Sequence, residues 1–346
     1  MASMKNFLVG RTIKAARRLE QQHQWSAAID LLTTANKARR HQTLEHELVQ
    51  MRHRSFYGSN QTGVDTWPPQ FTDPFPPGPG IPEIKASELS VELVRAGVLG
   101  HGALIVRGLL APDDVARLHG VIDACYDGQD QWYATEQPSP NDWYHEFRST
   151  VSEQTAEASL FGRSWHRKGS AVLAADTPQG LFTYLDIVRK RGIAALAEQY
   201  LGERPAISVE KTVFRRVPPD TLGGWHQDGA FLGEGIHSLN LWIAVTDCGA
   251  EAPTMEFVAT RLNHIVETGT GDAPYQWAVG DDVARSVAGP NSTVRPHFQA
   301  GDAIFFDQMN LHTTSGGPTM TKTRYAVESW WFAPSHYPPT TLPVMV

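Results

Sequence analysis

The chain has 346 residues, of which 41% are hydrophobic and 19% charged, and its formal net charge is −7. Its 33 Phe, Tyr and Trp residues exclude a disordered chain, because so much aromatic surface has to be buried. The sequence contains no apolar run of about 18 residues that could span a membrane, and its two cysteines do not make a disulfide framework. At the N-terminus a few apolar residues precede the basic ones, which is the reverse of a secretory signal, so we expect a cytoplasmic protein without membrane contact.

Residues 1–66 are predicted to form a helical extension, because apolar residues recur at steps of three and four between Leu19 and Met51. Residues 1–57 hold ten Lys/Arg against four Asp/Glu, but no nucleic-acid-binding motif accompanies this excess, so we expect no nucleic-acid partner. The stretch around Trp25 resembles one helix pair of a tetratricopeptide-type repeat, which is too little for a solenoid. We expect these helices to pack on the rest of the chain or to join two copies of it in a homo-oligomer.

Residues 67–87 are predicted to be an extended connector. Seven prolines and two glycines lie between Trp67 and Pro82, and no periodicity accompanies them. This change in composition is the best domain boundary in the sequence, so we assign residues 88–346 to a single domain.

The first part of that domain has a mixed pattern. Residues 102–107 read as a strand, and a helix is predicted to begin near Pro112. A second helix is predicted over residues 182–201. Residues 127–170 are rich in aromatic side chains without a period, so we expect long loops there.

After residue 205 the sequence indicates β-structure. Short runs rich in Val, Ile, Phe and Trp alternate with Gly and Pro turns, at residues 211–217, 237–245, 302–307 and 324–332. The pattern predicts a mainly β fold with flanking helices, arranged as a sandwich or barrel.

A histidine and an aspartate in the motif of residues 223–229, Gly-Gly-Trp-His-Gln-Asp-Gly, suggest a metal site. On a strand, His226 and Asp228 would project to the same side and offer an imidazole and a carboxylate to one ion. His312 follows the predicted strand 302–307 and could supply a third ligand. Two histidines and one carboxylate leave one face of an octahedral ion open, which is typical of non-haem Fe(II) oxygenases.

Arg324 begins the next apolar strand, and Thr314 lies two residues after His312. A 2-oxo acid that chelates iron needs a cation for its far carboxylate, and an inward-pointing guanidinium suits that role. Each of these residues is a weak signal alone, whereas the ordered set is a strong one. The other histidines considered as ligands lack a comparable pattern; they are His145, His166, His237, His264 and His297.

With these motifs the sequence resembles the phytanoyl-CoA dioxygenase-like branch of the Fe(II)/2-oxoglutarate oxygenases over roughly residues 88–335. The matching segments are residues 102–110 with the helix after Pro112, Trp225 to Asp228, Asn240 to Val245, Gly301 to Thr314, and Arg324. Residues 252–264 depart from the family pattern at the turn and wall on the substrate side.

The resemblance implies a double-stranded β-helix (jelly-roll) core and catalysis by Fe(II) on the three ligands, with 2-oxoglutarate and O2 as co-substrates. It implies that Arg324 grips 2-oxoglutarate with Thr314 nearby, and that Trp242 lies close to the co-substrate. Because Asp228 is present where related halogenases have a small residue, we expect hydroxylation of a C–H bond in a small organic metabolite, with succinate and CO2 as co-products.

Two other readings stay open. The same barrel could support 2-oxoglutarate-independent metal chemistry, as in cupin-type dioxygenases. Alternatively, the barrel could be a non-catalytic scaffold whose helical extension binds a protein partner. The substrate itself is not specified, because the aromatic residues that could line a pocket could equally fill the core; they are Trp132, Trp143, Trp165, Phe231, Trp330 and Trp331.

Overall fold

The computed structural model describes residues 2–59, 63–64, 66–134, 141–151, 163–289 and 293–346. Its longer helices are α1 (Ala2–Gln21), α2 (Trp25–Ala38), α3 (Gln42–Gly58), α5 (Pro112–Tyr133), α7 (Pro178–Lys190), α8 (Ile193–Leu201) and α10 (Asp281–Ala288). The shorter helical turns are η1 (Ala86–Glu88), α4 (Val91–Arg95), η2 (Ala96–Gly100), η3 (Ala174–Asp176), α9 (Gly229–Leu232) and η5 (Pro334–His336). The strands are β1 (Glu83–Lys85), β2 (Ala103–Arg107), β3 (Ala171–Leu173), β4 (Ala206–Val217), β5 (Ser238–Ala244), β6 (Thr254–Val258), β7 (Thr293–Val294), β8 (Ala303–Phe306), β9 (His312–Ser315), β10 (Arg324–Phe332) and β11 (Pro343–Met345).

Two β-sheets form the centre of the molecule. The larger sheet has the order β1-β2-β8-β5-β10-β4-β11, with β3 paired to β4, and the smaller has the order β7-β6-β9. Residues 222–226 extend the smaller sheet through the bridges Leu222–Ser315 and His226–His312. From β4 onward the chain passes repeatedly from one sheet to the other, which is the path of a double-stranded β-helix. The predicted fold, mainly β with flanking helices, is confirmed.

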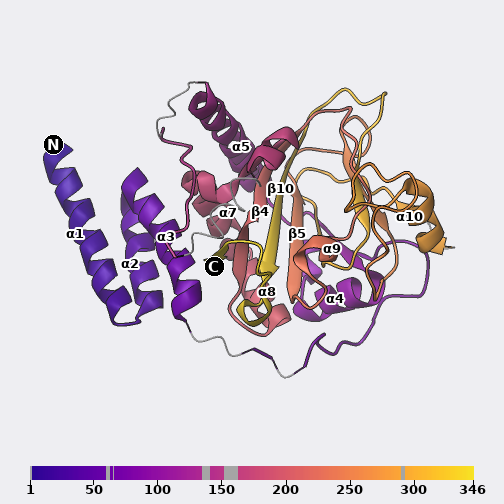
Figure 1. Ribbon diagram of the computed structural model, residues 1–346, viewed down its shortest axis with the longest axis horizontal. Coiled ribbons are helices and arrows are strands. Elements are labelled where there is room, and N and C mark those ends of the chain that lie inside the picture. The colour runs from indigo at the N-terminus through magenta and orange to yellow at the C-terminus, as the bar shows by residue number, and fades with distance from the viewer. Residues whose placement is uncertain (1, 60–62, 65, 135–140, 152–162, 290–292) are drawn as a thin grey trace.

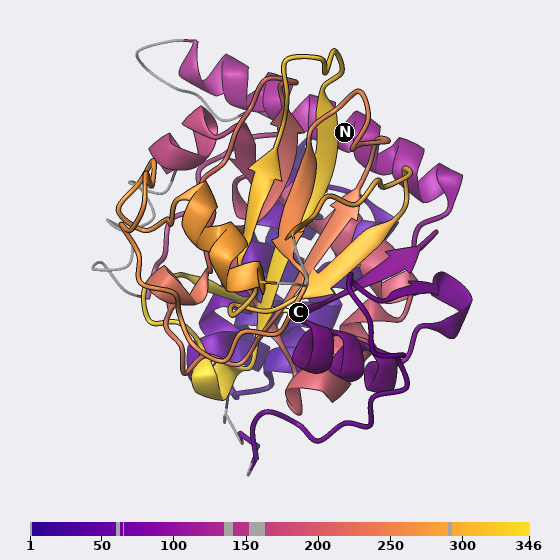
Figure 2. The same ribbon diagram turned by 90° about the vertical axis from the view of Figure 1, so that its right-hand side faces the viewer.

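The N-terminal helices α1, α2 and α3 lie in a row at one end of the molecule, and α10 lies at the other (Figure 1). Seen from the α10 side, the sheets stand in front of these helices (Figure 2). The three helices bury a small core of their own, in which Ala28, Leu32 and Leu48 are almost inaccessible. In α3, Arg52 donates a hydrogen bond to the carbonyl of Met345 in β11 at 2.8 Å. The predicted helices are therefore present and pack on the rest of the chain, while the domain boundaries and a homo-oligomer stay predictions.

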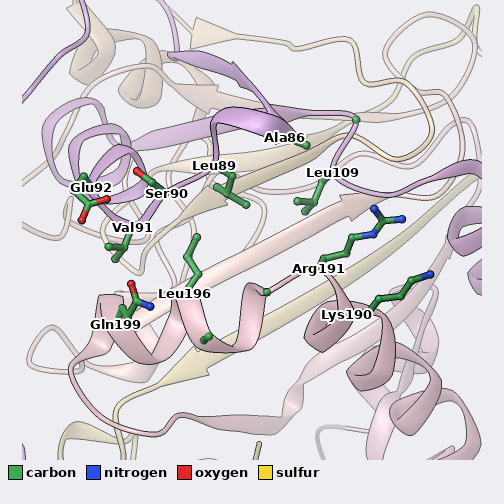
Figure 3. Close-up of a pocket in the computed structure, with 13 residues that line it drawn as sticks. Ala86, Leu89, Ser90, Val91, Glu92, Leu109, Lys190, Arg191, Leu196 and Gln199 are labelled. Carbon is green, nitrogen blue, oxygen red and sulfur yellow. The ribbon is translucent and has the colours of Figure 1, made fainter.

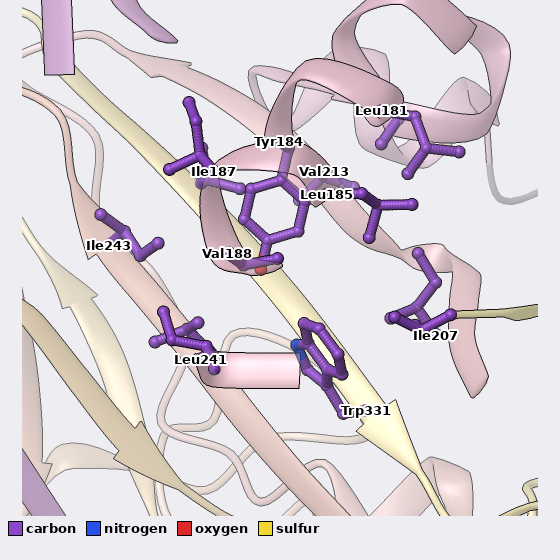
Figure 4. Close-up of a cluster of buried hydrophobic side chains, with 14 of the residues drawn as sticks. Leu181, Tyr184, Leu185, Ile187, Val188, Ile207, Val213, Leu241, Ile243 and Trp331 are labelled. Atoms are coloured by element: carbon purple, nitrogen blue, oxygen red, sulfur yellow. The ribbon is translucent and has the colours of Figure 1, made fainter. Parts of the chain in front are cut away.

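Helices cover the outer face of the larger sheet. Figure 4 shows Tyr184 and Val188 of α7 against Leu241 of β5 and Trp331 of β10. These side chains belong to the main hydrophobic core, and full burial of each one stabilises the fold by about 1.5–3 kcal/mol. The alternating apolar residues of β5 face this layer, as their period of two predicts.

The structure corrects several element boundaries. The helix predicted over 182–201 is two helices, α7 and α8, because Gly192 between them adopts a left-handed conformation with φ of 74°. The loops predicted over 127–170 are wrong at both described ends: α5 continues to Tyr133, and residues 163–168 form a helix. Trp132 and Tyr133 pack against the main core, which explains the longer α5. Residues 135–140 and 152–162 of that stretch lie outside the described residues.

Two further differences concern strands. The connector predicted over 67–87 ends in a strand, since β1 pairs with β2 in parallel and forms the edge of the larger sheet. The strand predicted from residue 211 begins earlier, at Ala206, because its first residues pair with β11. None of the helices in the described part of the chain has the length and apolarity that a membrane span requires.

Candidate metal centre

His226, Asp228 and His312 meet where residues 222–226 pair with β9 of the smaller sheet. His226 and His312 form a backbone pair, in which the N–H of each donates to the carbonyl of the other at 2.9 and 3.0 Å. Their rings are 4.4 Å apart between centroids. The Nε2 atoms of His226 and His312 lie 3.9 and 3.6 Å from Oδ2 of Asp228. One ligand atom from each residue lies within 4.8 Å of the others, which is a geometry that could hold a metal ion.

Asp228 reaches this position by a route that the sequence did not predict. We expected His226 and Asp228 to share one strand face, but Asp228 has helical angles (φ −62°, ψ −25°) and precedes α9. The intervening Gln227 is buried and accepts a hydrogen bond from the N–H of Val266 at 2.8 Å. Its amide group donates to the carbonyl of Met309 at 2.8 Å. Gln227 thus fixes the turn that brings the carboxylate back toward His226.

Hydrogen bonds to backbone carbonyls set the tautomers of the two histidines. Nδ1 of His226 lies 2.8 Å from the carbonyl oxygen of Gly224, and Nδ1 of His312 lies 3.1 Å from that of Asn310. A carbonyl oxygen only accepts, so Nδ1 carries the proton in both rings and Nε2 keeps its lone pair. Both lone pairs are therefore available on the atoms nearest Asp228. The same arrangement orients metal-binding histidines in general.

The electrostatics keep the site ready for a cation. Burial, and then the neighbouring His312, lower the pKa of His226 to about 4, and burial also lowers the pKa of His312. Burial alone would raise the pKa of Asp228, but Lys211 and the two histidines outweigh it and lower that pKa to about 2. Nζ of Lys211 donates to Oδ1 of Asp228 at 2.8 Å. Two neutral imidazoles and one ionised carboxylate fit Fe(II) with an open face.

The interior of the barrel contains buried polar groups that suit a second ligand. Arg324 is 1% exposed, its Nη1 donates to the carbonyl of Thr254 at 3.1 Å, and its guanidinium carbon lies 5.5 Å from the ring centre of Trp242. Nε of Arg324, Nε1 of Trp242, Nε1 of Trp330 and both amide atoms of Asn240 have no hydrogen-bond partner within the described residues. Each such buried group without a partner destabilises the fold by about 1–3 kcal/mol. A ligand with carboxylate groups, such as 2-oxoglutarate, could accept hydrogen bonds from the unpartnered N–H donors of this set, but not pair with Oδ1 of Asn240, which is itself an acceptor.

Thr314 stands apart from this set. Its hydroxyl contacts the sulfur of Met255 at 4.0 Å, and no hydrogen bond within the described part of the chain joins it to Arg324.

The sequence analysis did not identify Lys211 as a site residue, although a lysine inside an apolar strand was a usable signal, since lysine is seldom buried unless it is paired. It also missed the second interior ion pair, in which Nε of Arg215 donates to Glu328 at 2.7 Å.

The other histidines considered from the sequence do not join the triad, although His166 lies close enough to Lys211 and Arg215 for their charges to lower its pKa. The ring of His145 packs on that of His46 at 4.4 Å, and the ring of His237 stacks on those of Trp67 and His336. His264 is exposed. The structure therefore groups His312, and none of these, with His226 and Asp228.

A separate surface hollow of about 530 Å³ lies between the α4 region and α8 (Figure 3). Leu89, Leu109 and Leu196 line it together with Lys190 and Arg191. Both of these cations contact the single carboxylate of Asp114 in α5, which offsets one of their two positive charges. None of the three candidate metal ligands lines this hollow, and its chemistry adds nothing to the metal centre.

Comparison with known proteins places the fold and site in context. The model of the family described as Phytanoyl-CoA dioxygenase (PhyH) matches residues 99–322, which is well over half of the chain. No curated protein matches the sequence.

Several solved structures are similar in part. The epimerase SnoN in complex with Fe3+, alpha ketoglutarate and nogalamycin RO is 19% identical, with 70% of this chain and 83% of that chain covered and a TM-score of 0.44. The alpha ketoglutarate-dependent carbocyclase SnoK from nogalamycin biosynthesis is 18% identical, with 74% and 87% covered and a TM-score of 0.45. EvdO2 from Micromonospora carbonacea var. aurantiaca complexed with 2-oxoglutarate is 16% identical, with 71% and 89% covered and a TM-score of 0.44. All three TM-scores are below 0.5, so these similarities carry no argument about function.

Proposed function

The chain belongs to the phytanoyl-CoA dioxygenase (PhyH) family of non-haem Fe(II)/2-oxoglutarate-dependent oxygenases, and from this premise we propose a residue-level assignment of its site. His226, Asp228 and His312 hold Fe(II), and Arg324 binds the far carboxylate of 2-oxoglutarate. The reaction is the hydroxylation of a C–H bond in a small organic molecule. When bound, Fe(II) and 2-oxoglutarate supply the O2-dependent oxidation, with succinate and CO2 as co-products.

The observation that carries this proposal is the orientation of the two imidazoles. Both Nδ1 protons are held by backbone carbonyls, so both Nε2 lone pairs lie beside Oδ2 of Asp228. A histidine pair that only filled the core would have no reason to aim two lone pairs at an ionised carboxylate. The low pKa of Asp228 keeps the third ligand charged, and the ion pair with Lys211 offsets part of the desolvation cost of this buried carboxylate.

The interior polar groups support a site for the 2-oxo acid at Arg324. Arg324 presents a buried guanidinium, and charge-assisted hydrogen bonds to a carboxylate are about twice as strong as neutral ones. Trp242 lies against this guanidinium and limits the volume around it, which orients the ligand. Thr314 is left out of the assignment, because its hydroxyl contacts the sulfur of Met255.

The decisive experiment is anaerobic visible absorption of the full chain, titrated with Fe(II) and 2-oxoglutarate together. We expect a metal-to-ligand charge-transfer band that is lost in His312→Ala and weakened in Arg324→Met. His264→Ala is the matched control, since His264 is an exposed histidine in the same region.

The alternatives give different results in the same titration. Iron uptake without a band would favour a 2-oxoglutarate-independent, cupin-type reaction and contradict the role of Arg324. No iron uptake by the folded protein would overturn the assignment of the three ligands and favour the scaffold reading.

A further inference from the structure

A continuous series of aromatic rings leads from the candidate metal centre to the protein surface. We call Phe231, Trp277, Tyr275 and Trp165 the aromatic wall. Its inner members contact a proposed ligand: the ring of Trp277 stands edge-to-face on that of His226 at 5.2 Å, and Phe231 stacks on His226 at 6.2 Å.

The outer members of the wall continue the series. Tyr275 stacks on Trp277 with ring centres 4.8 Å apart and planes inclined by 4°. Trp165, from the helix of residues 163–168, meets Tyr275 and Trp277 edge-to-face at 5.6 and 5.9 Å. Segments that are more than 100 residues apart in the sequence thus contribute to one surface.

The loop that carries Tyr275 and Trp277 is fixed to the strand of the metal centre. The N–H of Val279 donates to the carbonyl of Trp225 at 2.9 Å, and Nε1 of Trp225 donates to Asp281 at 3.1 Å. A Cβ atom on Gly224 would lie 3.0 Å from Pro274 and 3.1 Å from Ala278, so the loop packs directly on the strand. The rings are therefore held in position before any ligand arrives, which reduces the entropy lost on binding.

Three rings of the wall remain open to solvent. Phe231 is 37% exposed, Tyr275 is 42% exposed and Trp165 is 45% exposed. Large aromatic side chains normally bury their surface, and a contiguous apolar patch on a soluble protein commonly marks a binding site. This patch is continuous with the metal centre through Trp277 and Phe231, so its natural occupant is the substrate of that centre.

The charges beside the wall favour an uncharged occupant. Lys211 lies 4.3 Å from the ring centre of Phe231, but its ammonium group is paired with Asp228. Arg215 is paired with Glu328 in the same interior region. An anionic substrate would have to compete with these carboxylates for Lys211 and Arg215, whereas a neutral ring would not.

We propose that the aromatic wall binds an uncharged substrate with a flat, fused ring system, which stacks on the face of Tyr275 that Trp277 leaves free, meets the perpendicular ring of Trp165 edge-on and points toward the site that contains His226. This inference rests on the proposed function, because the wall can position a substrate for reaction only if His226 binds the catalytic iron. Phe231, Trp277, Tyr275 and Trp165 would then determine specificity by shape, without hydrogen bonds to the ring.

The test uses isothermal titration calorimetry of the full chain, loaded with Fe(II) and 2-oxoglutarate under argon. The probes are 2-naphthol, its saturated counterpart decahydro-2-naphthol, and methyl β-glucoside. We expect 2-naphthol to bind at least about fivefold more tightly than either of the other probes, and Tyr275→Leu and Trp165→Leu each to weaken its binding about fivefold. Tyr57→Leu is the matched control, because Tyr57 is a tyrosine of similar exposure (47%) on α3 and should leave binding unchanged.

The charge-transfer band of each sample is read in the same experiment. An intact band with equal binding of 2-naphthol and decahydro-2-naphthol, or with no effect of Tyr275→Leu, would overturn the wall as a flat-ring site. Preferential binding of methyl β-glucoside would overturn it in favour of a sugar. Absence of the band in the wild-type protein is the failure of the proposed function, and it is distinguishable because the band reports on the metal centre, whereas the heat of 2-naphthol binding and its loss in Tyr275→Leu report on the wall.

Discussion

The two faces of the larger sheet have opposite surroundings, although the same strands build both. On β5, Leu241 and Ile243 point outward into the core beneath α7, whereas Asn240 and Trp242 point into the barrel. The outward side chains are apolar and tightly packed. The inward ones include polar atoms without hydrogen-bond partners in the described structure.

This difference separates stability from function. The outer face stabilises the fold through apolar burial, so removing an apolar side chain there should lower the free energy of unfolding. The inner face keeps buried polar groups whose desolvation is offset only when a ligand supplies partners. A single strand can serve both purposes because successive side chains point to opposite faces. Variants on the two faces should therefore have separable effects on stability and on activity.

The largest effect should come from removing a candidate metal ligand. His312→Ala is expected to lower the rate of 2-oxoglutarate turnover by more than about a thousandfold, which corresponds to roughly 4 kcal/mol in the barrier. The β9 strand keeps its backbone pairing, so the change in the free energy of unfolding should be smaller than that in the barrier. Succinate formation and urea unfolding measure the two quantities. If His264→Ala reduces turnover equally, the assignment of His312 is wrong.

A variant on the outer face should show the opposite behaviour. Trp331 is 1% exposed and packs beneath α7, so Trp331→Ala should lower the free energy of unfolding by about 3–5 kcal/mol through the cavity that it leaves. At a temperature where the variant is still folded, its charge-transfer band should be unchanged. Thermal unfolding followed by circular dichroism checks the first statement. Loss of the band from folded Trp331→Ala protein would show that the two faces are not separable.

A variant of Arg324 tests whether the inner face binds 2-oxoglutarate. Arg324→Met should raise the KM for 2-oxoglutarate by about 10–100-fold, because a charge-assisted hydrogen bond contributes about 1.5–3 kcal/mol. Stability should change little or even increase, since burial already disfavours the charged guanidinium and lowers its pKa to about 10. Initial rates at varied 2-oxoglutarate concentration give the KM. Arg285→Met, at an exposed arginine of α10, serves as the control and should leave the KM unaltered.

The smallest effect concerns pH. Burial, and then the charges of Lys211 and Arg215, lower the pKa of His166 to about 3, whereas the unfolded chain has an ordinary value near 6.5. Below about pH 6.5 the unfolded state binds the extra proton, so this residue makes stability fall as the pH falls, by up to about 1.4 kcal/mol per pH unit. His166→Gln should therefore lose less stability than the wild type between pH 7 and 5.

Urea unfolding of both proteins at pH 7, 6 and 5 measures this difference. Glu210, whose pKa burial raises to about 7, acts in the opposite direction but is common to both proteins. A steeper loss of stability in His166→Gln would contradict the prediction.

Local sequence patterns were sufficient to predict features that depend only on residues close together in the sequence. The period of two in β5 predicted which side chains face each side of the sheet, and β10 begins and ends as its apolar run indicates. The helices of the N-terminal extension follow from their periodic apolar residues. Patterns failed where packing determines an end: α5 extends because Trp132 and Tyr133 reach the core, and Gly192 divides a helix that periodicity alone would continue.

The sequence by itself determined the residue types of the site, since a His-x-Asp motif, a later histidine and an arginine on the next strand are all readable in order. Only the tertiary structure decided how they meet. His226 and His312 pair across strands that are far apart in the sequence, and Asp228 returns through the turn into α9 and not along a strand. Lys211 and the aromatic wall were likewise decided by the fold, because their partners come from distant segments. Contacts between distant segments depend on how strands and loops pack in three dimensions, and no periodicity within one segment encodes them.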